Sequence, residues 1–78
     1  MGIYRVSYEY SNSNSWNTDV GQPSQHGKIT DAVNSAIKYL SGPTANAETR
    51  VRIRTAERPG LVREITDYGY FDSGWVND

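Results

Sequence analysis

The stretch that decides the fold is Ile29–Ser41, with the sequence ITDAVNSAIKYLS. Its apolar residues recur every three or four positions, which places them on one side of an α-helix and fits no β-strand. The sequence therefore predicts a helix with one buried side, and the rest of the chain must provide the surface that covers it. The residues of this apolar side are Ile29, Ala32, Val33, Ala36, Ile37 and Leu40.

Both ends of this helix carry residues that are typical of helix boundaries. Thr30 is expected to be the N-cap, and Asp31 lies in the first turn, where the helix dipole favours a negative charge. At the other end, Gly42 can adopt the left-handed conformation that ends many helices, and Pro43 cannot continue the helix. The predicted helix is therefore bounded on both sides.

Two segments alternate with a period of two, which is typical of half-buried strands. They are Ile3–Tyr10 and Glu48–Ala56. Arg-Pro-Gly at 58–60 is a turn signal, so Leu61–Tyr68 is expected to be the returning strand of a hairpin with Glu48–Ala56.

The faces of this hairpin depend on its loop length, because a slip of one residue exchanges the two faces. A loop with an odd number of residues centred on 58–60 sets Arg54 opposite Glu64 and Arg50 opposite Tyr68. The apolar residues that then share the core face are Val51, Ile53, Leu61 and Ile65.

The predicted architecture is α+β with the order β-α-β-β. It consists of a three- to four-stranded antiparallel or mixed sheet with one helix packed on one face. If the strands on either side of the helix are parallel, their crossover should be right-handed. The polar connection Ser11–Gly27 leaves room for a short strand around Ser15–Val20, and the tail Gly69–Asp78 is expected to add an edge strand or to fold over the sheet. Residues 1–78 are expected to form a single domain.

Composition argues against most catalytic and metal-binding classes. The chain has no cysteine and one histidine, His26, so an ordinary transition-metal site and a cysteine nucleophile are not expected. A Ser–His–Asp triad with His26 and Asp19 can be assembled only on paper, because no nucleophile motif accompanies them. We therefore expect a non-enzymatic protein without cofactor or metal. No apolar run approaches the ~20 residues of a membrane span, so a cytoplasmic location is expected.

Arginines form the sharpest charged feature, although the net charge of the chain is only −1. Arg50, Arg52 and Arg54 alternate along one strand and project about 7 Å apart from the sheet face that the helix does not cover. They either form a solvated face neutralised by Glu9, Glu48, Glu57 and Glu64, or they bind an anionic surface.

Aromatic residues form the second feature. Trp16, Tyr68, Tyr70, Phe71 and Trp75 lie in the long loop and in the C-terminal region, outside the regular core pattern. They either close the open ends of a small core, or they anchor a protein interface, where tryptophan, tyrosine and arginine are enriched.

The stretches IYRVSYEY, ITDAVNSAIKYLSG and ETRVRIRTAERPGLVREI, in a short chain without cysteine, resemble small phage-encoded anti-CRISPR inhibitors in architecture. This resemblance implies stoichiometric binding that blocks a host defence nuclease, and it carries no functional residues over.

The sequence thus predicts a small protein-binding module, with a phage inhibitor of a host defence complex as its specific form. Two alternatives remain open: a nucleic-acid-binding protein that uses the arginine face, and a structural protein that self-associates as a homodimer through an edge strand. The predicted partner-binding residues are Arg50, Arg52, Arg54, Tyr68, Tyr70, Trp75 and Trp16.

Overall fold

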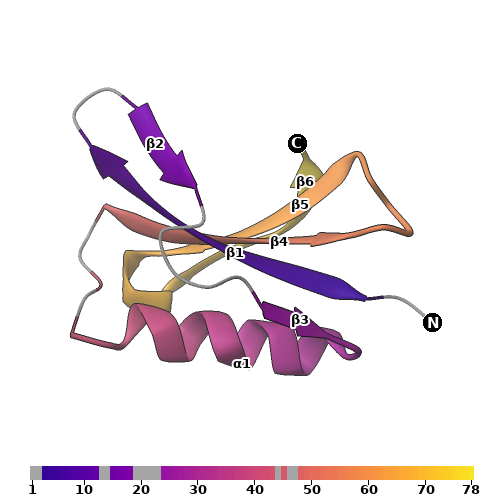
Figure 1. Ribbon diagram of the computed structural model, residues 1–78, viewed down its shortest axis with the longest axis horizontal. Helices are drawn as coiled ribbons and strands as arrows, with labels where there is room; N and C mark the ends of the chain where they lie inside the picture. The colour runs from indigo at the N-terminus through magenta and orange to yellow at the C-terminus, as the bar shows by residue number, and fades with distance from the viewer. Residues whose placement is uncertain (1–2, 13–14, 19–23, 44, 46–47) are drawn as a thin grey trace.

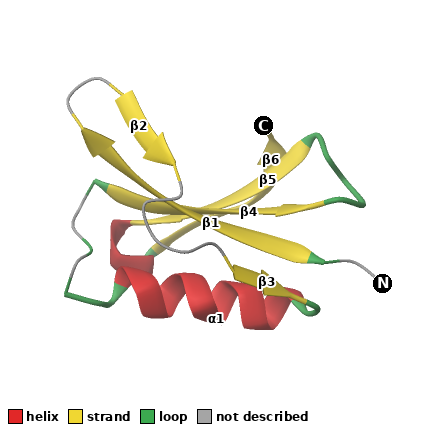
Figure 2. Ribbon diagram, viewed as in Figure 1, coloured by secondary structure: helices red, strands yellow, loops and turns green. Residues whose placement is uncertain are grey.

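The computed structural model describes residues 3–12, 15–18, 24–43, 45 and 48–78, and the side chains at 10–12 and 15–18 lie outside this description. One helix and one antiparallel sheet make up the structure (Figures 1 and 2). The elements in chain order are β1 (Tyr4–Asn12), β2 (Ser15–Thr18), β3 (Ser24–His26), α1 (Ile29–Leu40), β4 (Thr49–Thr55), β5 (Leu61–Thr66), the 3₁₀ turn η1 (Asp67–Gly69) and β6 (Phe71–Asn77).

The sheet has the strand order β2-β1-β4-β5-β6, and β3 also pairs with β1. All these pairs are antiparallel, and α1 lies along one face of the sheet (Figure 1). The α+β class and the single helix on one face are therefore confirmed, whereas the prediction of three to four strands was too low. The polar segment after β1 supplies β2 and β3, and the tail supplies β6 as an edge strand.

The predicted right-handed crossover does not arise, because β1 and β4 are antiparallel neighbours. The handedness rule applies only to parallel strands of one sheet. With the short strands β2 and β3 inserted before the helix, the chain reaches β4 in the direction opposite to β1.

Helix α1 spans the predicted residues, but its ends differ from the prediction. The N-cap is Lys28, which makes no side-chain capping bond, so Thr30 lies inside the helix instead of capping it. At the other end, Gly42 is absent from the described residues with positive φ. Gly42 matters there for space, because a Cβ would meet the Tyr39 carbonyl oxygen at 3.2 Å. The helix ends because Pro43 follows, not because of a left-handed glycine.

The core lies between α1 and the sheet. From the helix, Ala32, Ala36 and Leu40 are fully buried, whereas Ile37 is 40% exposed. The predicted apolar side of the helix is thus wider than the surface that the sheet provides. The sheet residues in the same cluster are Val6, Tyr8, Val51, Ile53 and Ile65.

The β4–β5 hairpin has an odd loop of five residues, 56–60, so the predicted faces are confirmed for Val51, Ile53 and Ile65. The register itself was wrong. Glu64 lies opposite Arg52 and not Arg54, and Arg50 lies opposite Thr66 and not Tyr68. The reason is that the loop 56–60 is centred on Arg58 and not on Pro59, which shifts β5 by two positions along β4 without exchanging its faces.

Strand β3 is joined to the core by a chain of side-chain hydrogen bonds. The Tyr8 hydroxyl lies 3.2 Å from Ser24 Oγ and 3.1 Å from Ser35 Oγ of α1, while His26 Nε2 lies 3.0 Å from Ser24 Oγ. The Tyr8 ring also stacks on Tyr39 with centroids 4.2 Å apart. These bonds satisfy a hydroxyl that is buried with the core, which explains how a three-residue strand is fixed.

Strand β6 is held to β5 by an ion pair on the helix side of the sheet. Arg63 donates from Nε and Nη2 to the Asp72 carboxylate, with the shortest contact at 2.7 Å. The register shifts between Arg63 and Ile65, and in this region Gly74 N donates to Asp72 Oδ1 at 2.9 Å. The hydrogen bond from Arg63 lowers the pKa of Asp72, which outweighs the opposing effect of its partial desolvation.

This shift predicts the acid sensitivity of the fold. Because the pKa of Asp72 is lower in the folded chain than in the unfolded chain, its stabilising contribution is present at neutral pH and is lost as pH falls through the folded pKa. Asp72→Asn should therefore unfold at lower urea concentration than the unsubstituted chain at about pH 7, and the two should converge near pH 2. The control is Glu57→Gln, which removes an exposed acid in the β4–β5 loop. An equal pH dependence for Asp72→Asn and the unsubstituted chain would contradict this account.

Candidate functional site

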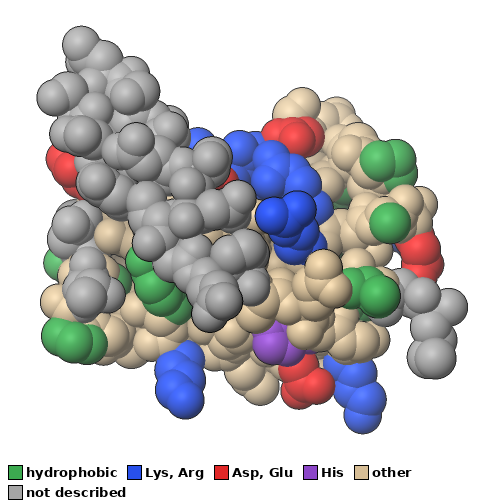
Figure 3. All heavy atoms as spheres, in the orientation of Figure 1, with side chains coloured by type: hydrophobic (Ala, Val, Ile, Leu, Met, Phe, Trp, Pro, Cys, Tyr) green, Lys and Arg blue, Asp and Glu red, His purple; other side chains and the backbone are tan. Residues whose placement is uncertain are grey.

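The sheet face opposite α1 carries the predicted arginines, and we call it the open face. The strict alternation of β4 directs Arg50, Arg52 and Arg54 to this face, while Val51 and Ile53 point into the core. In Figure 3, basic side chains in blue gather over the sheet next to an acidic side chain in red. The placement of the three arginines on one face is therefore as the sequence predicts.

Their charges, however, are engaged by carboxylates of the same chain. Glu9 of β1 lies between two of them, with its Oε1 3.3 Å from Arg50 Nη2 and its Oε2 3.7 Å from Arg52 Nε. Glu9 is only 1% exposed, although its place on the open face predicted a solvated side chain. Arg50 also pairs with Glu64 of β5 at 3.0 Å. The carboxylate is buried because two guanidinium groups surround it.

Asp78 provides a third internal carboxylate. It accepts hydrogen bonds from Arg52 Nη2 and from Arg54 Nε and Nη2, the latter two at 3.3 and 3.1 Å. Its backbone N–H donates to the Gly60 carbonyl at 3.0 Å, which anchors it beside the β4–β5 loop. The hydrogen bond from Arg54 is the main reason why the pKa of Asp78 is lowered. No local sequence pattern indicates this contact, since Asp78 is more than twenty residues from both arginines.

The aromatic residues separate into two groups. Trp75 packs against the core cluster, with its ring 6.3 Å from the Tyr4 ring, and thus has a core contact. Tyr68, Tyr70 and Phe71 are exposed to 45, 88 and 52%. Trp16 belongs to β2, opposite Ser11, and its side chain lies outside the described residues.

The exposed aromatic residues belong to a strained turn. Asp67, Tyr68 and Gly69 all have positive φ, with values of 55°, 57° and 90°. A bulky residue such as Tyr68 in this region costs of order 1–3 kcal/mol, and such strain is found preferentially at functional sites. Gly69 has no Cβ, and one built there would lie 3.6 Å from Cγ2 of Ile37 in α1.

Three exposed aromatic residues lie in this turn and directly after it, and we call them the aromatic patch: Tyr68, Tyr70 and Phe71. The turn itself packs next to α1, because a Cβ at Gly69 would lie 3.6 Å from Cγ2 of Ile37. The sequence predicted that Ile37 would be buried, which is wrong, since Ile37 is 40% exposed. The only sequence signal was the density of aromatic residues in 68–71.

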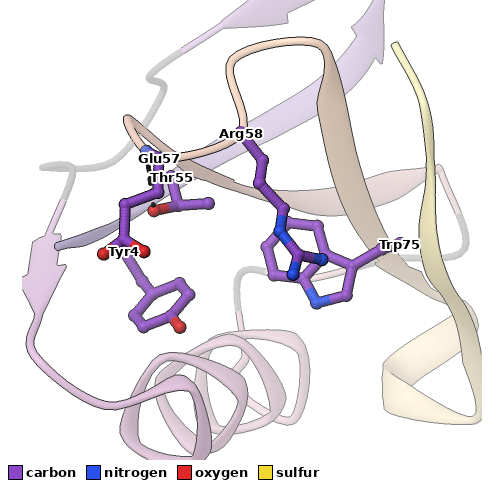
Figure 4. Close-up of a pocket in the computed structure, with 5 residues that line it drawn as sticks. All are labelled: Tyr4, Thr55, Glu57, Arg58 and Trp75. Atoms are coloured by element: carbon purple, nitrogen blue, oxygen red, sulfur yellow. Dashed lines mark hydrogen bonds between the residues drawn. The ribbon is translucent and has the colours of Figure 1, made fainter. Parts of the chain in front are cut away.

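Two hollows flank the β4–β5 loop on opposite sides of the sheet. The first, of about 200 Å³, is lined by Tyr4 and Trp75 as an aromatic wall and by Thr55, Glu57 and Arg58 (Figure 4). Within it, the Glu57 backbone N–H donates to Thr55 Oγ1 at 3.4 Å. Its volume is below the roughly 300–1,000 Å³ of typical small-molecule sites, so it suits at most one small polar group.

The second hollow lies on the open face and has a volume of about 430 Å³. We call it the loop groove, and its surface is mainly apolar. Its lining residues are Ile3, Arg5, Gln25, Arg54, Thr55, Ala56 and Pro59.

Catalytic and metal-binding chemistry was not predicted, and the described residues contain no group of three or more His, Asp or Glu that could hold a metal ion. His26 does lie within hydrogen-bond distance of a serine, Ser24, but that serine oxygen is also 3.2 Å from the Tyr8 hydroxyl. Asp19, the third member of the triad considered from the sequence, lies outside the described residues.

Comparisons with known proteins give no relative: no family model, curated protein or solved structure matches the chain. Within the described ranges, no helix is long and apolar enough to cross a membrane. The surfaces described above are therefore the basis for assigning a function.

The role of Glu9 gives a test of the open face. Glu9→Gln keeps the shape of the side chain but removes the charge that both arginines share, so we expect it to cost about 1.5–3 kcal/mol of unfolding free energy. Urea unfolding monitored by tryptophan fluorescence measures this loss. The matched control is Glu57→Gln, at an exposed position, which should be nearly neutral. Equal stability of the two variants would show that Glu9 does not hold the face together.

Proposed function

We propose that this chain is a protein-binding module whose aromatic patch contacts the partner. The observation that carries the proposal is the turn at 67–69, which presents Tyr70 at 88% exposure beside Phe71 and Tyr68. A backbone that places a tyrosine in the left-handed region in order to expose three aromatic side chains is costly for folding alone. Strain of this kind is accounted for when the exposed side chains serve binding.

The chemistry of the patch suits a protein partner. Tyrosine is enriched among the residues that dominate binding energy, because its ring buries a large apolar area while its hydroxyl forms a hydrogen bond. Tyrosine has only two side-chain torsions, so fixing its ring on binding costs little conformational entropy. Clustered apolar groups on the surface of a small domain are typical of interaction sites.

Protein binding has more support than nucleic-acid binding by the arginine face. Arg50, Arg52 and Arg54 are paired with Glu9, Glu64 and Asp78, so a phosphate backbone would have to compete with three carboxylates. Sheets that bind single-stranded RNA usually present stacking aromatic rings on their open face. Here the two described tyrosines of β1, Tyr4 and Tyr8, belong to the core on the helix side.

We further propose that the partner is a host defence nuclease complex that the chain inhibits by stoichiometric binding. The support is the architectural resemblance to phage-encoded anti-CRISPR inhibitors, together with a surface suited to protein binding. Expression of the chain should raise the plating efficiency of a targeted phage on bacteria with an active CRISPR system. Equal plating with and without the chain, across the types of system tested, would contradict the inhibitory role.

The aromatic patch is tested by three variants. Tyr70→Ser and Phe71→Ser should each weaken partner binding by about tenfold or more, which corresponds to about 1.4 kcal/mol, whereas Tyr70→Phe should retain most of the affinity because the ring remains. The measurement is a titration of the partner purified with the unsubstituted chain, after thermal unfolding has shown that the variants are folded.

Two outcomes would contradict the proposal. Unchanged affinity in both serine variants would remove the patch from the interface. Light scattering that shows a dimer of the unsubstituted chain, converted to a monomer by Tyr70→Ser, would mean that the patch serves self-association.

A further inference from the structure

On the open face, two arginines hold a single carboxylate between them. Arg52 and Arg54, which we call the arginine fork, are successive outward residues of β4, and both donate to Asp78. Arg54 contributes two N–H groups to one oxygen, Oδ2. The fork thus has the geometry of a carboxylate site, and the structure shows it occupied by a carboxylate of the same chain.

The loop groove adjoins this fork, because Arg54 belongs to both. Its apolar part consists of Ile3, Ala56 and Pro59, and Ile3 is 55% exposed. The volume of about 430 Å³ lies within the range of sites that enclose a ligand group. An apolar hollow therefore lies beside a bound carboxylate.

We propose that the arginine fork and the loop groove bind an acidic, hydrophobic segment of a protein partner, whose carboxylate replaces Asp78 while a neighbouring apolar side chain enters the groove. This inference rests on the proposed protein-binding function and adds a second contact surface to it. Asp78 is then an intramolecular competitor that occupies the fork when no partner is bound.

The charges of the open face favour a single carboxylate as the ligand. When Asp78 leaves, Arg52 and Arg54 both lose the carboxylate to which they donate, while Glu9 and Glu64 stay in place beside Arg50. One acidic side chain restores the lost contact. A nucleic-acid strand brings a phosphate for every nucleotide and would face the two glutamates as well, which is unfavourable.

The contact between Asp78 and the fork is open to solvent. The side chains of Asp78 and Arg54 are each 37% exposed, so a carboxylate from solution can reach the guanidinium groups and exchange with Asp78. Displacement by a partner exchanges one carboxylate for another and adds the burial of an apolar side chain. An internal competitor that occupies the fork most of the time weakens the binding of the partner. The apparent affinity of the partner is its intrinsic affinity multiplied by the fraction of chains in which the fork is unoccupied.

The test measures the binding of a short peptide of alternating glutamate and leucine to the full chain by heteronuclear NMR titration. Asp78→Asn should bind this peptide about tenfold more tightly than the unsubstituted chain, which corresponds to about 1.4 kcal/mol. Arg54→Gln should bind it more weakly. Asp31→Asn makes the same chemical change on the exposed side of α1 and should have no effect.

Several results would overturn the proposal. The first is equal affinity of Asp78→Asn and the unsubstituted chain for the glutamate–leucine peptide. The second is that a peptide of alternating glutamate and serine binds as tightly as the glutamate–leucine peptide. The third is that an oligothymidine strand binds more tightly than the glutamate–leucine peptide. If Arg54→Gln is unfolded, the affinity of Asp78→Asn for the peptide decides the test. Tyr70→Ser should leave peptide binding unchanged, so a failure at the fork and a failure of the aromatic patch are distinguishable.

Discussion

The buried carboxylate of Glu9, held between Arg50 and Arg52, is the contact on which the open face depends. One helix can cover only one side of a sheet, and among the residues that the structure describes no second helix lies over the other side. Charged side chains lie on that face instead, where the guanidinium groups of Arg50 and Arg52 enclose the Glu9 carboxylate. Val62 lies on the same face of β5 as Glu64, which is the open face. It is only 4% exposed, although it does not belong to the core cluster between α1 and the sheet. The face is thus a second, thinner layer of structure built from ion pairs.

This arrangement changes how the arginines are interpreted. Three arginines in alternation suggest a cationic surface, but each of them has a carboxylate partner within the chain. The energy available for recognition by charge alone is small, because any ligand must first displace an internal acid. Apolar groups carry no such penalty, and the aromatic patch is where the fold leaves them exposed. Binding at the patch and occupancy of the fork are therefore separate properties of two surfaces.

The sequence predicted the parts of the fold that depend on local periodicity. The spacing of apolar residues defined α1, the alternation in β4 defined its two faces, and the parity of the hairpin loop placed Ile65 in the core. Features that depend on long-range contact were missed. Ile37 is on the apolar side of the helix, yet it is 40% exposed, because the sheet and η1 do not cover it fully. The positive φ of Tyr68 has no sequence signal, since tyrosine disfavours it. The contact of Asp78 with the fork required knowledge of where β6 ends.

Whether internal carboxylates occupy the arginines of the open face can be measured through the exchange of arginine side-chain N–H protons with solvent. Arg54 should give a resolved Nε–H signal that exchanges slowly at neutral pH, because this group donates to Asp78. Arg63, whose Nε–H donates to Asp72, should behave in the same way. Arg58, which lies exposed in the β4–β5 loop, is the internal reference and should exchange rapidly. Replacement of Asp78 by asparagine should speed up exchange at Arg54 and leave Arg63 unchanged. Exchange of Arg54 at the rate of Arg58 in the unsubstituted chain would contradict the pairing of the open face.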